Sequence, residues 1–101
     1  MTDNHIRLFG TVKRTKSMKS PAGIPHWIAT LEHKSQRYEA ELLRNVYLQI
    51  QVIMSGAQFA PIAEKLEAGM EMSVEGFIAM QTSRSGQNKM VLHAEQVDLK
   101  I

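Results

Sequence analysis

Hydrophobic and polar positions alternate with a period of two through most of this 101-residue chain. The clearest stretch spans residues 46–54, where Tyr47, Gln49 and Gln51 fall between apolar neighbours. The opposite side of this stretch carries Val46, Leu48, Ile50, Val52 and Met54. Alternation with this period predicts a half-buried β-strand with one face on a core and the other in water.

The same alternation predicts four further strands. The first carries Ile6, Leu8 and Val12 and is interrupted by Gly10, which indicates a bulge or a barrel corner. The second spans about residues 24–33. The fourth carries Met70, Met72, Val74, Ile78 and Met80 and is broken by Gly76, and the fifth runs from Lys89 to Leu99.

Between the third and fourth predicted strands the apolar spacing becomes helical. Phe59, Ile62, Ala63 and Leu66 recur at this spacing after Ser55-Gly56 ends the third strand. Pro61 suits only the start of a helix, and Gly69 is well placed after its end.

Three polar segments read as connections between strands. Residues 20–23 and 83–88 have turn composition, and the charged stretch 34–41 is expected to join the second and third strands. The order is then three strands, a short helix and two strands, which OB-folds use for a five-stranded barrel. We therefore predict one all-β OB-fold domain over residues 1–101.

The chain contains no cysteine, which excludes disulfides, thiolate nucleophiles and cysteine-based zinc sites. Its first residues have no basic flank followed by an apolar run, so we expect no signal peptide. No apolar run is long enough for a membrane span, so we expect no membrane partner. These features fit a protein of the reducing cytoplasm.

Charge is uneven along the chain although the net charge is only +2. The first 50 residues hold eight Lys and Arg against four acids, and the remainder holds four against six. Lys13, Arg14, Lys16 and Lys19 lie within seven positions, with no acid between Asp3 and Glu32. This stretch is a candidate phosphate-facing surface, and the alternative is an ordinary solvated basic loop.

Five motifs resemble the primosomal replication protein N (PriB) family. They are GIPH (23–26), LEH (31–33), VIMSG (52–56), VEGFI (74–78) and KMVLHAEQ (89–96). The resemblance runs from about residue 10 to residue 99, and the last motif is the most specific. More broadly, LFGTVKRT followed by SPAGIPH is similar to the opening of bacterial single-stranded DNA-binding proteins.

The resemblance implies an OB-fold homodimer that binds single-stranded DNA without marked sequence preference and needs no cofactor or metal. It also implies an accessory role in the replication restart primosome, bridging DNA with the restart helicase PriA and with DnaT. The bacterial single-stranded DNA-binding protein is a further partner that the resemblance suggests.

The resemblance also implies a set of DNA-contacting residues. Its basic positions match Arg14, Lys19, Lys34, Arg44, Arg84 and Lys89. On an OB-fold these cations are expected to converge on strands two and three and on the loops after strands one and four. Arg14 and Lys19 match less securely because the first loop is one residue shorter here.

Tyr47 is the candidate aromatic platform for a DNA base, because it projects opposite the apolar face of its strand. Packing against neighbouring side chains is the alternative role. The family often has Trp at this position, an aromatic where Leu42 stands and a lysine where Thr82 stands. All three departures predict weaker binding.

Several other residues are expected to be structural. Trp27 shares a face with Ala29 and Leu31, which favours a place in the core over base stacking. Met70, Met72 and Met80 are expected to fill gaps in that core.

The histidines do not predict a metal site. His26 and His33 are seven residues apart, which on a regular strand puts them on opposite faces, and no carboxylates complete a ligand set. His93 and Glu95 are two residues apart on one predicted strand, a spacing that favours a surface hydrogen bond.

Two other functions compete with DNA binding. An enzyme would need a nucleophile with its base, a carboxylate pair or a phosphate-cradling glycine loop, and the sequence shows no such pattern. We therefore expect no catalysis. The second rival is a protein-interaction adaptor of the primosome with incidental DNA contacts, because one surface could bind proteins and DNA in turn.

Overall fold

The computed structural model describes residues 2–100, which form a five-stranded β-barrel with a short helical segment between the third and fourth strands. The elements are β1 (Ile6–Lys19), β2 (Pro25–Glu39), β3 (Leu42–Ser55), η1 (Ala57–Phe59), α1 (Ala60–Ala63), β4 (Glu71–Thr82) and β5 (Asn88–Lys100). The predicted OB-fold class and order of elements are confirmed. Within residues 2–100 no helix is long and apolar enough to cross a membrane.

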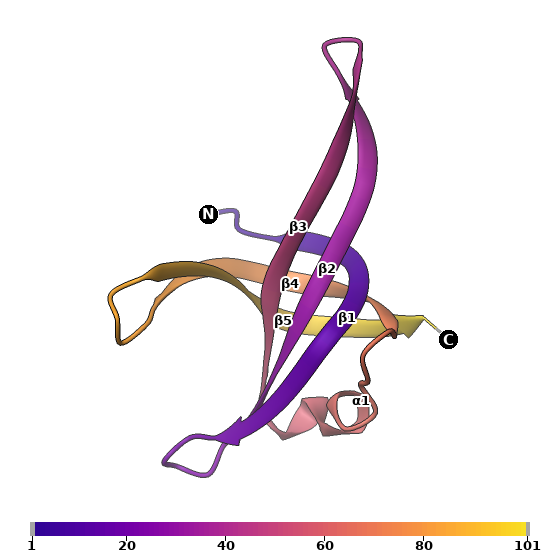
Figure 1. Ribbon diagram of the computed structural model, residues 1–101. Helices are drawn as coiled ribbons and strands as arrows, with labels where there is room; N and C mark the ends of the chain where they lie inside the picture. The colour runs from indigo at the N-terminus through magenta and orange to yellow at the C-terminus, as the bar shows by residue number, and fades with distance from the viewer. Residues whose placement is uncertain (1, 101) are drawn as a thin grey trace.

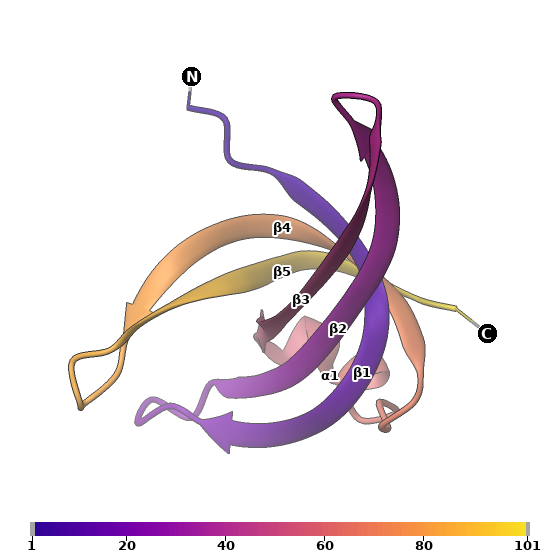
Figure 2. The ribbon, with the colours of Figure 1, turned by 45° about the horizontal axis from the view of Figure 1, so that its top comes forward.

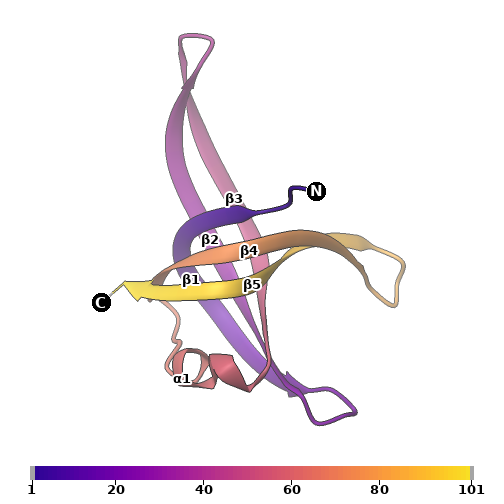
Figure 3. The ribbon, with the colours of Figure 1, turned by 180° about the vertical axis from the view of Figure 1, so that it is seen from behind.

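The barrel closes in the order β1-β2-β3-β5-β4. All neighbouring strands are antiparallel except β3 and β5, which pair in parallel from Gln51–Ile53 to Val91–His93. Strand β1 serves two neighbours: Ile6 to Thr11 pair with β4, and Thr11 to Lys19 pair with β2. Figures 2 and 3 show β1 curving around the barrel between them.

Gly10 lies where β1 curves from one neighbour to the other. A Cβ atom at this position would lie 2.5 Å from the carbonyl oxygen of Glu32 and 2.8 Å from the Leu31 side chain. A bulge between Val12 and Arg14 follows directly. Bulges increase local bending and twist, so the break predicted at Gly10 corresponds to this barrel corner.

The core lies inside the barrel and consists of the apolar faces that the alternation predicts. Its fully buried members include Val12, Ala29, Leu31, Val52, Met54, Met72, Val74 and Leu92. The helical segment lies across one end of the barrel (Figure 3), where Phe59, Ala63 and Leu66 join the core. Trp27, which its pattern places in the core, packs against this cluster but is only partly buried.

The stretch 34–41 is a strand hairpin, so the prediction of a polar connection there is wrong. Strands β2 and β3 stay in register up to the pair Glu39 and Leu42. Ala40 and Glu41, with φ of 52° and 66°, make the turn, as two-residue hairpins with left-handed turn residues do. The hairpin extends well beyond the barrel (Figure 1), so both of its faces are solvated and neither needs apolar residues.

Three smaller expectations are also corrected. Regular α-helix covers only Ala60–Ala63, because the preceding turn is a 3₁₀-helix. Met80 is 58% exposed and not in the core, because its part of the β4–β5 hairpin lies beyond the barrel. The His93 ring stacks on Phe77, with centroids 4.9 Å apart. A bulge leaves Glu95 unpaired between Ala94 and Gln96.

At Gly76 the backbone of β4 passes close to that of β5. Gly76 pairs with Ala94 next to a bulge, at the position where the sequence pattern of this strand is broken. A Cβ atom there would lie 1.8 Å from the carbonyl oxygen of His93, which is backbone and cannot rotate away. The close approach therefore requires glycine.

We predict that Gly76→Ala lowers the free energy of unfolding by about 3 kcal/mol, because the methyl group forces β4 and β5 apart. Gly23→Ala is the matched control, since its φ of 84° strains alanine but nothing lies within 4 Å of the added methyl. It should cost only about 1 kcal/mol. Urea unfolding monitored by circular dichroism measures both, and equal losses would contradict the steric explanation.

Candidate nucleic-acid interface

The outer face of β1, β2 and β3 is polar and is organised in cross-strand rows. Tyr47 on β3 pairs with Lys34 on β2, and Gln49 pairs with Glu32. In the next row Gln51 pairs with Thr30, which in turn pairs with Arg14 on β1. The register therefore puts an aromatic ring, amides and cations on one continuous surface.

Gln51 lies at the centre of this surface. It lines an open hollow of about 190 Å³ together with Arg14, Thr30, Gln49 and Lys89. It also lines two adjoining hollows, one reaching Lys16 on β1 and the other reaching the β4–β5 turn. The hollows surround the place where β3 meets β5, so cations from opposite sides of the barrel meet there.

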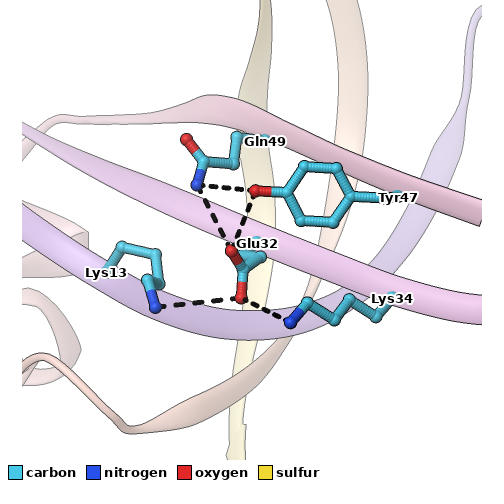
Figure 4. A network of polar contacts seen from close by, with 5 residues as sticks. All are labelled: Lys13, Glu32, Lys34, Tyr47 and Gln49. Atoms are coloured by element: carbon cyan, nitrogen blue, oxygen red, sulfur yellow. Dashed lines mark hydrogen bonds and ion pairs between the residues drawn. The ribbon is translucent and has the colours of Figure 1, made fainter.

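Glu32 holds together a polar network next to these hollows (Figure 4). Its Oε2 accepts hydrogen bonds from the Tyr47 hydroxyl at 3.0 Å and from Gln49 Nε2 at 3.3 Å. Gln49 Nε2 also donates to the Tyr47 hydroxyl oxygen at 3.0 Å. The other carboxylate oxygen lies 3.8 Å from the Nζ atoms of both Lys13 and Lys34.

The network shifts the pKa of both acidic groups. Hydrogen bonds from Gln49 and Tyr47, helped by the two lysines, hold the pKa of Glu32 below its ordinary value of 4.5. The hydrogen bond to Glu32 raises the pKa of Tyr47 above its ordinary value of 10.0. The contribution of ionised Glu32 to the free energy of unfolding is lost as the pH falls through its lowered pKa. That of Tyr47 is lost as pH rises through its raised pKa, so both are present at neutral pH.

Tyr47 has an accessible ring that is fixed at its far end. The side chain is 58% exposed, while its hydroxyl group is held by Glu32 and Gln49 (Figure 4). Lys34 Nζ lies 5.8 Å from the ring centroid, within the range of a cation–π contact. An exposed ring with a cation beside it can stack on a base while the cation neutralises a phosphate.

The structure brings only some of the predicted cations together. Arg14 and Lys89 line the same hollow, and Lys34 lies beside Tyr47. Arg44 is further out on the β2–β3 hairpin, where its Nε atom lies 3.2 Å from Oε1 of Glu39. Lys19 is at the far end of β1 beside Trp27, and Arg84 is in the β4–β5 turn. The six cations therefore form a track along three segments and not a single cluster.

The histidines have hydrogen-bonding roles. His26 Nδ1 lies 2.8 Å from the Ser55 hydroxyl. His33 Nδ1 lies 2.6 Å from the carbonyl oxygen of Phe9, and its Nε2 lies 2.8 Å from the Ser35 hydroxyl. Among residues 2–100 no group of three His, Cys, Asp or Glu side chains is arranged to hold a metal ion.

Comparison with known proteins identifies the family. Residues 4–96 match a family described as "another single-strand binding protein family". The chain is 58% identical over 100 residues to the replication restart protein PriB of Shewanella baltica and 59% identical to that of Shewanella piezotolerans. Each alignment covers 99% of both chains. The chain belongs to the PriB family.

Solved structures show the same fold at lower sequence identity. The PriB protein of Ralstonia solanacearum superposes with a TM-score of 0.80 at 22% identity, covering 99% of this chain and 100% of that one. The single-stranded DNA-binding protein of Thermus aquaticus superposes with a TM-score of 0.80 at 22% identity, covering 97% of this chain and 50% of that one. The barrel of this PriB-family chain is thus shared with single-strand binding proteins.

Several residues of this surface could not be singled out as site residues from the sequence alone. They are Lys13, Lys16, Glu32, Gln49 and Gln51. The crowding of Lys13 and Lys16 in the basic stretch is a general signal for two of them. Glu32, Gln49 and Gln51 give none, because their meeting depends on the register between β2 and β3.

We predict that Glu32→Gln lowers the pKa of Tyr47 towards 10.0, because an amide no longer opposes the phenolate charge. Absorbance of the phenolate measures this in a Tyr38→Phe background, where Tyr47 is the only tyrosine. Glu75→Gln is the control: it removes an equal charge that pairs with Arg7 at 3.0 Å. A Tyr47 titration unchanged by Glu32→Gln would contradict the network.

Proposed function

We propose that this protein binds single-stranded DNA without marked sequence preference and without catalysis. The observation that carries the proposal is the exposed ring of Tyr47, which lies beside the Lys34 cation and two residues along β3 from Gln49, a residue lining the hollow of Arg14 and Lys89. Every base has an aromatic face, so stacking on such a ring tolerates any sequence. The cations would neutralise the phosphates on either side of the stacked base.

The polar lining supports the same proposal. Gln49 and Gln51 present amide groups, which can donate to or accept from a phosphate, a sugar or a base edge. Arg14 and Lys89 approach the lining from β1 and β5. A strand following this surface would therefore meet positive charge from both sides of the barrel and a ring along β3.

We further propose an accessory role in bacterial replication restart, in the cytoplasm. The support is the name that the Shewanella relatives carry, replication restart protein PriB, at 58–59% identity over nearly the whole chain. The partners that the family resemblance suggests are the restart helicase PriA and DnaT. In this proposal the protein bridges DNA with both, and its DNA contacts are part of its function and not incidental to an adaptor role.

The proposed assembly is a homodimer. Phe9 and Phe77, 40% and 39% exposed, are large apolar side chains on the outside of the barrel. Burying such residues against a second copy is a common reason for symmetric dimers. A dimer would also place two DNA-binding surfaces in one particle.

We predict that Tyr47→Ala weakens binding of an oligothymidylate roughly five- to 150-fold, because it removes a stacking platform worth about 1–3 kcal/mol. Fluorescence anisotropy of a labelled oligonucleotide measures the affinity. In the same assay Lys89→Ala should flatten the plot of log affinity against log salt by about 0.7 for each phosphate that the lysine no longer neutralises.

Lys65→Ala is the control for charge, because this exposed lysine follows α1 and lies outside the proposed surface. It should leave the salt slope unchanged. If Tyr47→Ala and Lys89→Ala both bind DNA like the parent protein, the proposed surface is wrong and the adaptor function is favoured.

We predict that the protein has about twice the monomer mass of 11.4 kDa in solution at micromolar concentration. Light scattering coupled to size-exclusion chromatography measures this. Phe77→Glu should shift the population towards the monomer, because it would bury a charge in the interface. A monomeric parent protein would contradict the proposed assembly.

A further inference from the structure

The β2–β3 hairpin carries a second tyrosine in line with Tyr47. Along the hairpin the cross-strand pairs Lys34–Tyr47, Gln36–Asn45 and Tyr38–Leu43 alternate with Ser35–Val46 and Arg37–Arg44. Successive pairs point to opposite faces of a two-stranded ribbon. Tyr38 and Tyr47 therefore share one face, with Tyr38 nearer to the tip.

The spacing of the two rings suits one continuous strand of nucleic acid. Tyr38 is four residues beyond Lys34, the partner of Tyr47, which at about 3.3 Å per residue is roughly 13 Å. Stacked nucleotides in one strand of a duplex rise by about 3.4 Å. A strand stacked on Tyr47 therefore reaches Tyr38 within about four nucleotides.

Tyr38 is open to solvent on a ribbon whose two strands stay paired to the turn. Its side chain is 79% exposed, more than that of Tyr47, and it stands directly opposite the half-exposed Leu43. The two strands stay paired up to Glu39 and Leu42, and Ala40 and Glu41 make the turn. Figure 1 shows this ribbon projecting from the barrel.

The charges on the hairpin favour a polyanion on the face of the tyrosines. They also indicate how far towards the tip the polyanion can extend. Lys34, with a side chain that is 71% exposed, lies on the same face as both tyrosines. Arg37 and Arg44 stand directly opposite each other on the reverse face, where Glu39 Oε1 lies 3.2 Å from Arg44 Nε, so this pair does not add to the charge of the tyrosine face. Glu39 and Glu41 follow at the tip, where a phosphate would be repelled.

We infer that Tyr38 is a second base-stacking residue, on which the DNA path over Tyr47 ends. The inference rests on the proposed function, since it extends the same path outward along the hairpin. The occupant is a base of the strand already stacked on Tyr47. A partner protein seated on Tyr38 is the alternative that the experiment excludes or favours.

The test compares an oligothymidylate of about 3 nucleotides, which is too short to join Tyr47 to Tyr38, with one of about 16 nucleotides, which is within the site sizes found for OB-folds. Tyr38→Ala should weaken binding of the long oligonucleotide roughly five- to 150-fold and leave the short one unchanged, because the short one is held at Tyr47 and the hollow. Tyr38→Phe should retain the affinity. Tyr47→Ala should weaken both oligonucleotides.

Leu42→Ala is the matched control, because Leu42 is 63% exposed at the same tip but pairs with Glu39 on the reverse face. It should leave both affinities unchanged. A second readout uses Tyr38→Trp in a Trp27→Phe background, where the long oligonucleotide should quench the emission and the short one should not.

The outcomes separate the role of Tyr38 from DNA binding as a whole. If the parent protein binds neither oligonucleotide, the proposed function fails. If the parent protein binds both and Tyr38→Ala binds the long one equally well, only the role of Tyr38 fails. In that case, if Tyr38→Ala no longer bound a partner protein that the parent protein binds, the ring would be assigned to protein docking.

Discussion

A parallel pairing only three residues long, between Gln51–Ile53 and Val91–His93, closes the barrel. Because β3 and β5 separate on either side of it, the β2–β3 and β4–β5 hairpins extend away from the barrel independently (Figure 1). Gln51 lies at this junction and lines three of the hollows around it. The brevity of the closure thus creates both the hollow and the projecting hairpin that the candidate interface uses.

The proposed DNA surface contains a carboxylate beside Tyr47, which changes how the neighbouring cations act. The Oε1 atom of Glu32 lies 3.8 Å from the Nζ atoms of both Lys13 and Lys34. The carboxylate therefore partly neutralises these lysines before any phosphate binds. A phosphate that pairs with either lysine must compete with this carboxylate. With a net charge of only +2, the protein would depend on aromatic stacking for a larger share of its affinity than a strongly basic protein does.

The sequence predicts those parts of the fold in which one face of a strand is buried. On β4, the buried Met72 and Val74 alternate with the polar residues Glu71, Ser73 and Glu75, because one side of the strand lies on the core. The same signal fails from 34 to 41 and at Met80, where the hairpins leave the barrel and neither face needs to be apolar. Exposure of Tyr47 followed from alternation, whereas its bonds to Glu32 and Gln49 depend on cross-strand register, which periodicity does not determine.

The register between β2 and β3 also bears on the expectation that Tyr47 and Leu42, which depart from the family pattern, weaken DNA binding. Tyrosine offers less stacking area than tryptophan, and Leu42, on the reverse face from Tyr38, offers no ring. Each aromatic platform is worth about 1–3 kcal/mol, so one additional ring is enough to offset a smaller one. Tyr38 supplies that ring on the same face as Tyr47. The strand's course would then run from the hollow of Arg14 and Lys89 over Tyr47 to Tyr38, and the affinity would depend on how many platforms an oligonucleotide spans.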